Sequence, residues 1–305
     1  MGFAGITGIM VLVLASIVGT AIRISIPASS LLLAVVLPQV LGCLVAGITL
    51  SSLKDRLSSI LVIGLSTGLG GSLSSFSLLS VASALLALET GAGLAVFLIL
   101  STVSFCFAAL YFARHLGDTL DSALPDGTLP DFGDCWQAKL GLVLVCTGTA
   151  SILIAFAYTR SASVNVLSLL LGPLGTLLRY ALASLNGGKL LMLNLEHSGT
   201  LAANILGTAI LGLAFSFWTP SNCHWGQAVA QGFCGCLTTV STLISELDSI
   251  HTVSGKYKYG AITFFSTVVC LSVVVGVPYW TGAALKPQAC ILSSTTYTSA
   301  TSLYT

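Results

Sequence analysis

The chain has 305 residues, of which 55% are hydrophobic and only 7% are charged, and its mean hydropathy is +0.99. Soluble domains carry about a quarter of charged residues. The composition and the net charge of +1 therefore exclude a soluble enzyme, a disordered chain and a basic nucleic-acid-binding protein. Because a helix needs roughly 20 apolar residues to cross a bilayer, the sequence predicts an all-α integral membrane protein.

Nine apolar segments follow one another along the chain, each bounded by charges, prolines or polar clusters. They span residues 3–26, 31–52, 58–87, 91–112, 138–158, 163–184, 199–217, 226–247 and 258–281. Between the fourth and the fifth, residues 114–136 hold five of the ten acidic residues. Pro125 and Pro130 disfavour a helix there, so we expect a solvated linker. The serine- and threonine-rich residues after Lys286 predict a mobile tail.

Nine crossings would leave the two termini on opposite sides of the membrane. The side that holds the N-terminus receives seven of the Lys and Arg residues, and the other side receives at most three. Positive residues concentrate in cytoplasmic loops. The sequence therefore predicts a cytoplasmic N-terminus and an external C-terminus.

The chain also repeats itself. Residues 19–23 resemble residues 175–179, and residues 68–77 resemble residues 232–241 at an offset of 164. Two four-helix units separated by one extra crossing would be inverted relative to each other, and inverted repeats place binding sites near the bilayer midplane. The predicted units are a first repeat at 1–113, an acidic loop and linking transmembrane helix at 114–160, a second repeat at 161–281 and a C-terminal tail at 282–305.

Both repeats contain a long segment that glycines interrupt at matching positions, near residues 68–75 and 232–243. Glycines followed by hydroxyl residues can unwind a helix, and carbonyls freed in lipid need a partner within the protein. A bound cation is one such partner, and close packing of helices through small residues is the alternative explanation. The same interruption in both repeats favours a shared central site.

Polar residues inside the apolar segments are candidates for a path through the protein. Asn204 lies deep in one segment, where its amide donates either to an anion or to another helix. Tyr259, Thr263 and Thr267 recur every four residues and form one polar stripe. Arg179 is expected near the cytoplasmic mouth, where it either attracts anions or extends to the surface.

Signals for coupled transport or catalysis are weak. Glu246 is expected near a helix end, and no segment shows a clear intramembrane acid, which favours passive conduction over coupled pumping. No nucleotide-binding loop and no Ser/His/Asp arrangement occurs in the sequence, so no enzyme is predicted.

Three motifs in the second repeat resemble those of a known family. They are Gly-x-x-x-Arg-Tyr at 175–180, Gly-Thr-Leu-x-x-Asn-x-x-Gly at 199–207, and Gly-Phe-Cys-Gly-x-Leu-Thr-Thr-x-Ser-Thr at 232–242. Their order and spacing resemble the CrcB/Fluc fluoride channels, and the two-repeat chain is similar to the fused eukaryotic fluoride exporters of that family. The resemblance covers residues 1–281 and is weaker in the first repeat, where Gln39 corresponds to Asn204 and the motif at Arg23 lacks its tyrosine.

The resemblance implies a structural sodium ion between the two helix interruptions. By position, its ligands would be backbone carbonyls of Gly71, Ser74, Gly235 and Thr238. It also implies phenylalanines along two anion paths. Phe76 keeps one of these four positions, whereas Leu79, Val240 and Leu243 occupy the others.

A single working pore follows from these departures, because the polar residues also lie on one side. Its expected lining is Asn204, Phe76, Thr239, Ser241, Thr263 and Thr267, with Arg179 near the mouth. The resemblance thus implies a passive plasma-membrane channel that exports fluoride and works as a single chain. A sodium-coupled transporter of a small anion and a non-conducting structural membrane protein are the alternatives.

Overall fold

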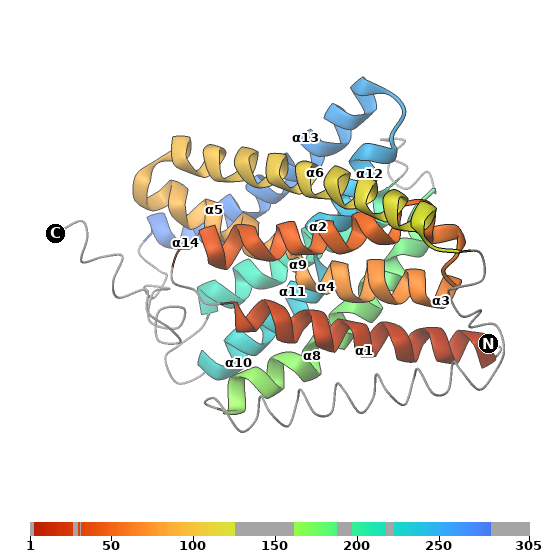
Figure 1. The fold of residues 1–305 in the computed structure, drawn as a ribbon. Coiled ribbons are helices and arrows are strands. Elements are labelled where there is room, and N and C mark those ends of the chain that lie inside the picture. The colour runs from red at the N-terminus through yellow and green to blue at the C-terminus, as the bar shows by residue number, and fades with distance from the viewer. Residues whose placement is uncertain are drawn as a thin grey trace.

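The computed structural model describes residues 3–26, 30, 32–125, 162–187, 197–217 and 223–281. Regular structure in these ranges is entirely helical, in agreement with the predicted class, and they contain no strand. The α-helices are α1 (Phe3–Ser25), α2 (Leu37–Thr49), α3 (Ser59–Val62), α4 (Gly71–Leu73), α5 (Phe76–Thr90), α6 (Ala92–Ala123), α8 (Ala162–Leu182), α9 (Ser198–Phe217), α10 (Cys223–Ala228), α11 (Gly235–Leu237), α12 (Val240–Ser249), α13 (Val253–Leu271) and α14 (Val277–Trp280). In Figure 1, α1, α2 and α6 run in nearly the same line, with the stretch from α3 to α4 between α1 and α2, and α8 and α13 cross them obliquely.

Seven helical stretches of the described chain are long and apolar enough to cross a membrane. They are Ile6–Ser25, Ser59–Thr90, Ala92–Ala123, Val166–Leu185, Ser198–Phe215, Trp225–Ser249 and Val253–Gly276. The predicted segment 31–52 forms a shorter apolar helix, Leu33–Thr49. The predicted segment 138–158 lies outside the described residues. The chain is therefore a multi-pass membrane protein by the length and composition of its helices.

Helix α6 extends further than the sequence predicts. The polar stretch from Arg114 was expected to be irregular, but α6 continues to Ala123. That expectation was wrong for 114–123 because a proline restricts mainly the residue before it. Leu124, which precedes Pro125, is the first extended residue (ψ 126°), and the helix ends there.

The predicted helix interruptions are present, and they fall on hydroxyl residues. Wide π-type turns at Ile63–Gly70 and Val229–Cys234 lead into the short helices α4 and α11. The backbone is then extended at Ser74 (ψ 141°) and Thr238 (ψ 152°). Helices α5 and α12 restart under the caps of Ser75 and Thr239, whose hydroxyls accept hydrogen bonds from backbone N–H groups three residues later. The glycines themselves remain helical.

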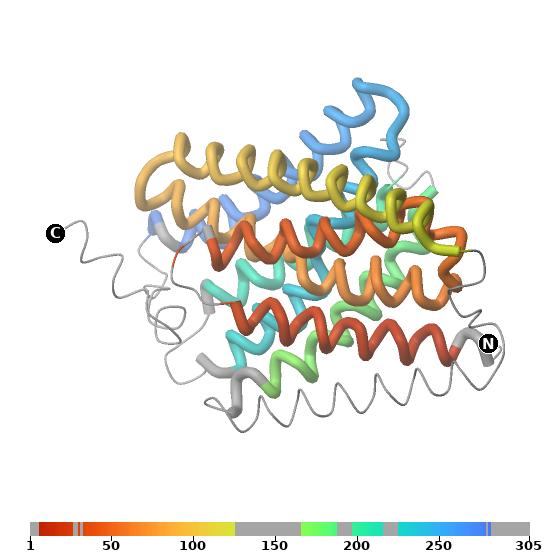
Figure 2. The backbone as a smooth tube through the Cα atoms, viewed as in Figure 1, coloured from red at the N-terminus to blue at the C-terminus, as the bar shows by residue number. Residues whose placement is uncertain are grey.

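The two parts of the chain exchange helices across the centre. Helix α5, which follows the first break, packs on α9 and α13, whereas α12, which follows the second break, packs on α2 and α6. Helices α1 and α8 also lie in contact, and Figure 2 shows both at the same edge of the bundle. Each break is therefore enclosed by helices from both ends of the sequence.

Candidate functional site

The two helix breaks meet at the centre through their hydroxyl groups. Ser74 Oγ lies 2.9 Å from Ser241 Oγ and 3.2 Å from Thr239 Oγ1. Thr238 Oγ1 lies 3.3 Å from Ser75 Oγ. All five residues are fully buried. The sequence placed these residues in one central site, and the structure brings them together.

An amide side chain binds the backbone at each break. On α9, Asn204 donates from Nδ2 to the Thr239 carbonyl at 3.2 Å, and its Oδ1 accepts from the Thr239 N–H at 2.9 Å. On α2, Gln39 donates to the Ser75 carbonyl at 3.2 Å and accepts from the Ser75 N–H at 2.7 Å. Each amide replaces hydrogen bonds that the break removes. Asn204 thus makes the interhelical bond that was one of its two expected roles.

The two amides differ in their second N–H group. Gln39 Nε2 also donates to the Val35 carbonyl at 3.1 Å, so both of its hydrogens are used. Asn204 Nδ2 makes a single hydrogen bond within the described part of the chain. Because Asn204 is fully buried, its remaining N–H points into the protein and can bind a ligand there.

Arg23 reaches the breaks from α1. Its guanidinium donates to the Ser72 carbonyl at 2.6 Å, to the Gly235 carbonyl at 2.8 Å and to the Gln231 carbonyl. Only 5% of the residue is exposed, although it was counted as a possible surface charge. The carbonyls that the breaks release attract it inward, because a cation in lipid is costly unless it is paired with such groups.

Arg179 does the same from α8. It donates to the Cys236 carbonyl at 3.0 Å and to the Thr67 carbonyl at 2.9 Å. At 4% exposure it does not extend to the surface, for the reason given for Arg23. Each arginine therefore binds the break in its own half of the chain and also the break in the other half.

Glycine is required where the arginines pass. A methyl group at Gly71 would lie 2.1 Å from Arg179 Nη1, and one at Gly235 would lie 2.4 Å from Arg23 Nη2. The close approach of a charged side chain to the backbone therefore explains both glycines.

Two carbonyls at the breaks are available as ligands for a cation. Extended backbone at Ser74 and Thr238 turns two carbonyls away from helical bonding, and neither accepts a hydrogen bond in the described part of the chain. At Gly235 the carbonyl already accepts from Arg23, so an ion there would share that oxygen with a guanidinium. Neutral carbonyls suit a singly charged ion.

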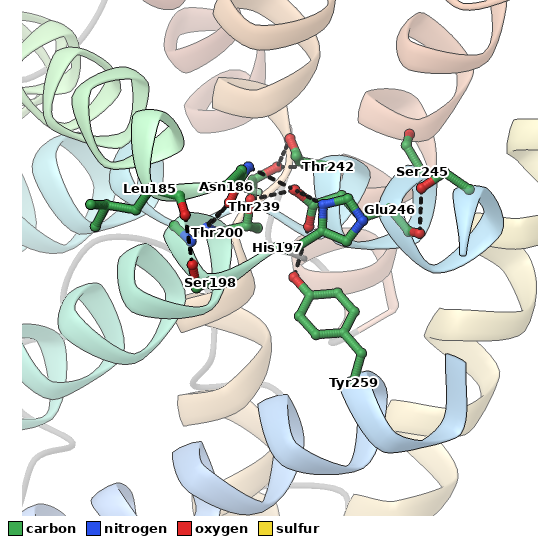
Figure 3. Close-up of polar contacts among 12 residues, drawn as sticks. Leu185, Asn186, His197, Ser198, Thr200, Thr239, Thr242, Ser245, Glu246 and Tyr259 are labelled. Carbon is green, nitrogen blue, oxygen red and sulfur yellow. Dashed lines mark hydrogen bonds and ion pairs between the residues drawn. The ribbon is translucent and has the colours of Figure 1, made fainter. Parts of the chain in front are cut away.

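A second polar cluster surrounds Glu246 of α12 (Figure 3). Thr200 Oγ1 donates to its Oε1, and Tyr259 Oη donates to its Oε2 at 2.7 Å. Asn186 Nδ2 and His197 Nδ1 each lie 3.5 Å from Oε1. Donors from α9, from α13 and from two residues between α8 and α9 thus converge on one carboxylate.

Glu246 lies in the last turn of α12, near a helix end as the sequence predicts, and it is nevertheless buried. It is 7% exposed and lies within the candidate span Trp225–Ser249. Because α12 restarts at Val240, Glu246 is only two turns from the break and faces α9 and α13. No local pattern indicated that Asn186 or His197 would lie beside it, because neither residue belongs to a recognisable motif.

The threonine stripe of α13 is buried. Thr263 and Thr267 are each at most 1% exposed, and their hydroxyls donate to carbonyls of their own helix. Phe76 is also fully buried, with its ring centroid 5.3 Å from that of Phe264. Phe264, which belongs to no motif, supplies a second ring beside Phe76.

The second half of the chain matches the model of a known protein family. Residues 166–278 match the family model described as "CrcB-like protein, Camphor Resistance (CrcB)". "Fluoride export protein 1" of Neurospora crassa is 42% identical over 121 residues, which cover 37% of this chain and 22% of that protein. "Fluoride export protein 1" of Candida albicans is 30% identical over 241 residues, or 70% of this chain and 59% of that protein.

A bacterial relative matches over a shorter stretch. "Fluoride-specific ion channel FluC" of Escherichia coli is 29% identical over 85 residues, which are 27% of this chain and 66% of that protein. No solved structure matches. The chain spans less than two thirds of the length of the fungal relatives. The relatives are named as an export protein and an ion channel, which agrees with the expectation that the chain is not an enzyme.

Proposed function

We propose that the chain is a member of the CrcB-like family, whose model matches residues 166–278, and that it is a passive channel that carries fluoride out of the cytoplasm. The observation that carries the proposal is the fully buried Asn204, whose amide secures a helix break and keeps one N–H for a ligand. The choice of fluoride as the ion rests on the names of the relatives.

Fluoride is small and strongly hydrated, so a path must replace its water with hydrogen-bond donors. Asn204 supplies an N–H, and the hydroxyls of Thr239, Ser241, Thr263 and Thr267 can rotate towards an ion. The positive edge of the Phe76 ring can add to them. A negative interior potential drives an anion outward by about 2.3 kcal/mol per 100 mV, and export then needs no ATP.

The proposed scaffold has nine transmembrane helices in two inverted repeats, at 1–113 and 161–281, which a linking helix joins. Support comes from the crossed contacts, in which corresponding residues of the two repeats bind each other's breaks. The chain would then act alone, as an internal pseudo-dimer. Its N-terminus would be cytoplasmic and its C-terminus external, in the plasma membrane.

Sodium is the proposed resident ion, and it would be structural. Carbonyls of Gly71, Ser74, Gly235 and Thr238 would hold it, and it would add positive potential beside the anion path. Arg23 already donates to one of these four carbonyls, that of Gly235, and both arginines bind neighbouring carbonyls of the breaks, so the ion would share its centre with two guanidinium groups.

One pore is proposed to conduct. Asn204, Thr263 and Thr267 border the side where α5 brings Phe76 against α9 and α13. On the other side, Gln39 has no unused N–H. That second path would be vestigial.

A coupled transporter is the second candidate, and the buried carboxylate of Glu246 favours it, because pumps use intramembrane acids as relays. Fluoride efflux from liposomes that contain the purified chain separates the two. A channel should release fluoride with no sodium or proton gradient and should leave chloride inside. Efflux that saturates and follows either gradient would select the transporter, and no efflux at all would contradict both.

A further inference from the structure

Thr208 carries the one serine or threonine hydroxyl of the described residues that is buried without a hydrogen-bond partner. Buried hydroxyls of a helix usually donate to the carbonyl four residues earlier, as those of Thr102 and Thr263 do here. Thr208 is 0% exposed and does not make this bond. An unsatisfied buried group is costly, so its retention requires an explanation.

Asn204 lies one helical turn before Thr208 on α9. It holds the other unused donor, since its Nδ2 makes a single hydrogen bond in the described chain. Residues four apart on a helix share one face, with roughly 5–6 Å between their Cβ atoms. Two unused donors therefore adjoin each other on one buried face.

Helix α13 closes this face at the same level. Thr200 and Tyr259 bind one carboxylate, and a methyl group at Gly212 would lie 3.2 Å from Leu271. Thr200 and Tyr259 are 59 residues apart in the sequence, and so are Gly212 and Leu271. Helices α9 and α13 therefore run parallel to each other in constant register. Thr208 consequently lies level with Thr267.

Beyond Thr208 this face becomes apolar. Leu211 and Phe215 of α9 belong to a buried cluster with Leu271 and Val275 of α13. Thr208 is thus the last hydrogen-bond donor on α9 before an apolar stretch, and an ion that leaves it must give up its last donors from that helix.

We propose that Asn204 and Thr208 bind one dehydrated fluoride ion between them, at the end of the polar path. A hydrogen bond from each donor to a small anion is about 2.7 Å long, and the two side chains leave Cβ atoms roughly 5–6 Å apart, so both donors can reach one ion between them. A larger halide needs its donors farther apart. The inference rests on the proposed function and adds to it a specific binding position that no motif indicates.

The first repeat provides an internal comparison. At the positions that correspond to Asn204 and Thr208 it has Gln39, whose amide hydrogens are both used, and Cys43, a weak donor. Such a pair cannot bind fluoride in this way, so only one of the two paths has the site.

The test is fluoride efflux from liposomes that contain the full chain with Thr208→Val, Thr208→Ser or Thr208→Cys. Thr208→Val should lower the rate at least about tenfold, since it removes a hydrogen bond to an ion, and Thr208→Ser should restore most of it. The efflux rate should also fall in Thr208→Cys, which has the residue of the first repeat and a side chain of similar volume. The matched control is Thr102→Val, whose hydroxyl is already bonded, and it should conduct like the original chain.

A second readout does not depend on conduction. Sodium fluoride, compared with sodium chloride at equal sodium, should raise the melting temperature of the purified original chain but not of Thr208→Val or Thr208→Cys. If the original chain conducts and these two variants conduct and respond to fluoride equally well, the site is refuted while the channel stands. If the original chain does not conduct, the channel fails, and the melting shift alone decides the site.

Discussion

Around its helix break the second half of the chain places Asn204, Glu246 and Tyr259, where the first half has Gln39, Ala82 and Ala95 at the corresponding positions. The breaks themselves are built alike, with extended hydroxyl residues, an amide and an arginine from each half. The features that both halves share therefore maintain the architecture, whereas the features of one half alone are the candidates for ion binding. Substitutions at paired positions can separate the two classes.

The largest expected difference lies between the paired amides. Asn204→Ala and Asn204→Asp should reduce fluoride efflux by about 100-fold, because a donor to the ion is lost. Gln39→Ala should change efflux by less than about threefold. Both alanine variants release the backbone of a break, so each should lose about 1–3 kcal/mol of stability.

Thermal unfolding of the purified variants measures that stability, and liposome efflux measures the transport. Equal loss of efflux at both amides, with similar stability, would mean that two equivalent pores conduct.

The paired glycines should instead behave alike. Gly71→Val and Gly235→Val push against Arg179 and Arg23 respectively, and overpacking costs about 1–3 kcal/mol. Melting temperature and efflux should fall at both sites. Gly93→Val is the control, because nothing lies within 4 Å of a methyl group there. Normal efflux and stability in both variants would refute the arginine contacts and the proposed sodium site.

Glu246 tests whether the polar cluster of one half serves transport. Glu246→Gln replaces an acceptor with a donor that faces Thr200 or Tyr259, so efflux should fall by about tenfold, equivalent to about 1.4 kcal/mol. Residual efflux should remain independent of a proton gradient. Ser245→Ala is the neighbouring control, since its hydroxyl bonds its own helix. A proton-driven efflux that disappears only in Glu246→Gln would favour coupled transport.

The smallest effect is expected at the edge of the bundle. Arg114 on α6 pairs with Asp248 on α12, and Tyr111 Oη donates to the same carboxylate at 2.5 Å. Both charged side chains are partly exposed, so Asp248→Asn should cost no more than about 1 kcal/mol. Efflux should be unchanged. A large loss of efflux would show that this contact between the two halves also shapes the path.

Periodicity and the repeat were sufficient to predict most helices and the positions of both breaks, because lipid imposes long apolar segments and because glycine and hydroxyl residues cluster where helices unwind. The destination of Arg23 and Arg179 was not predictable from local pattern. Their acceptors are backbone carbonyls up to 212 residues away, and every residue type has a carbonyl, so no sequence signal marks them.

The same reasoning explains the other omissions. Glu246 does lie in the last turn of α12, as predicted, but its burial depends on tertiary contacts that no local pattern indicates. Phe264 and Thr208 belong to no motif, and their roles arise from the register of α13 and α9 against other helices. The motif residues lie close together in the structure. The residues that complete the site are placed there by the packing of the helices, which no motif indicates.

The long reach of Arg23 has a consequence for biosynthesis. Its acceptor Gln231 lies 208 residues later in the chain, and ribosomes add about 5–20 residues per second. Roughly 10 to 40 s therefore pass in which a charged side chain has entered the membrane region before its final acceptor exists. The nascent first half must be held in that interval by lipid headgroups, water or the insertion machinery, and variants that weaken the second break should be cleared by quality control as incompletely assembled chains.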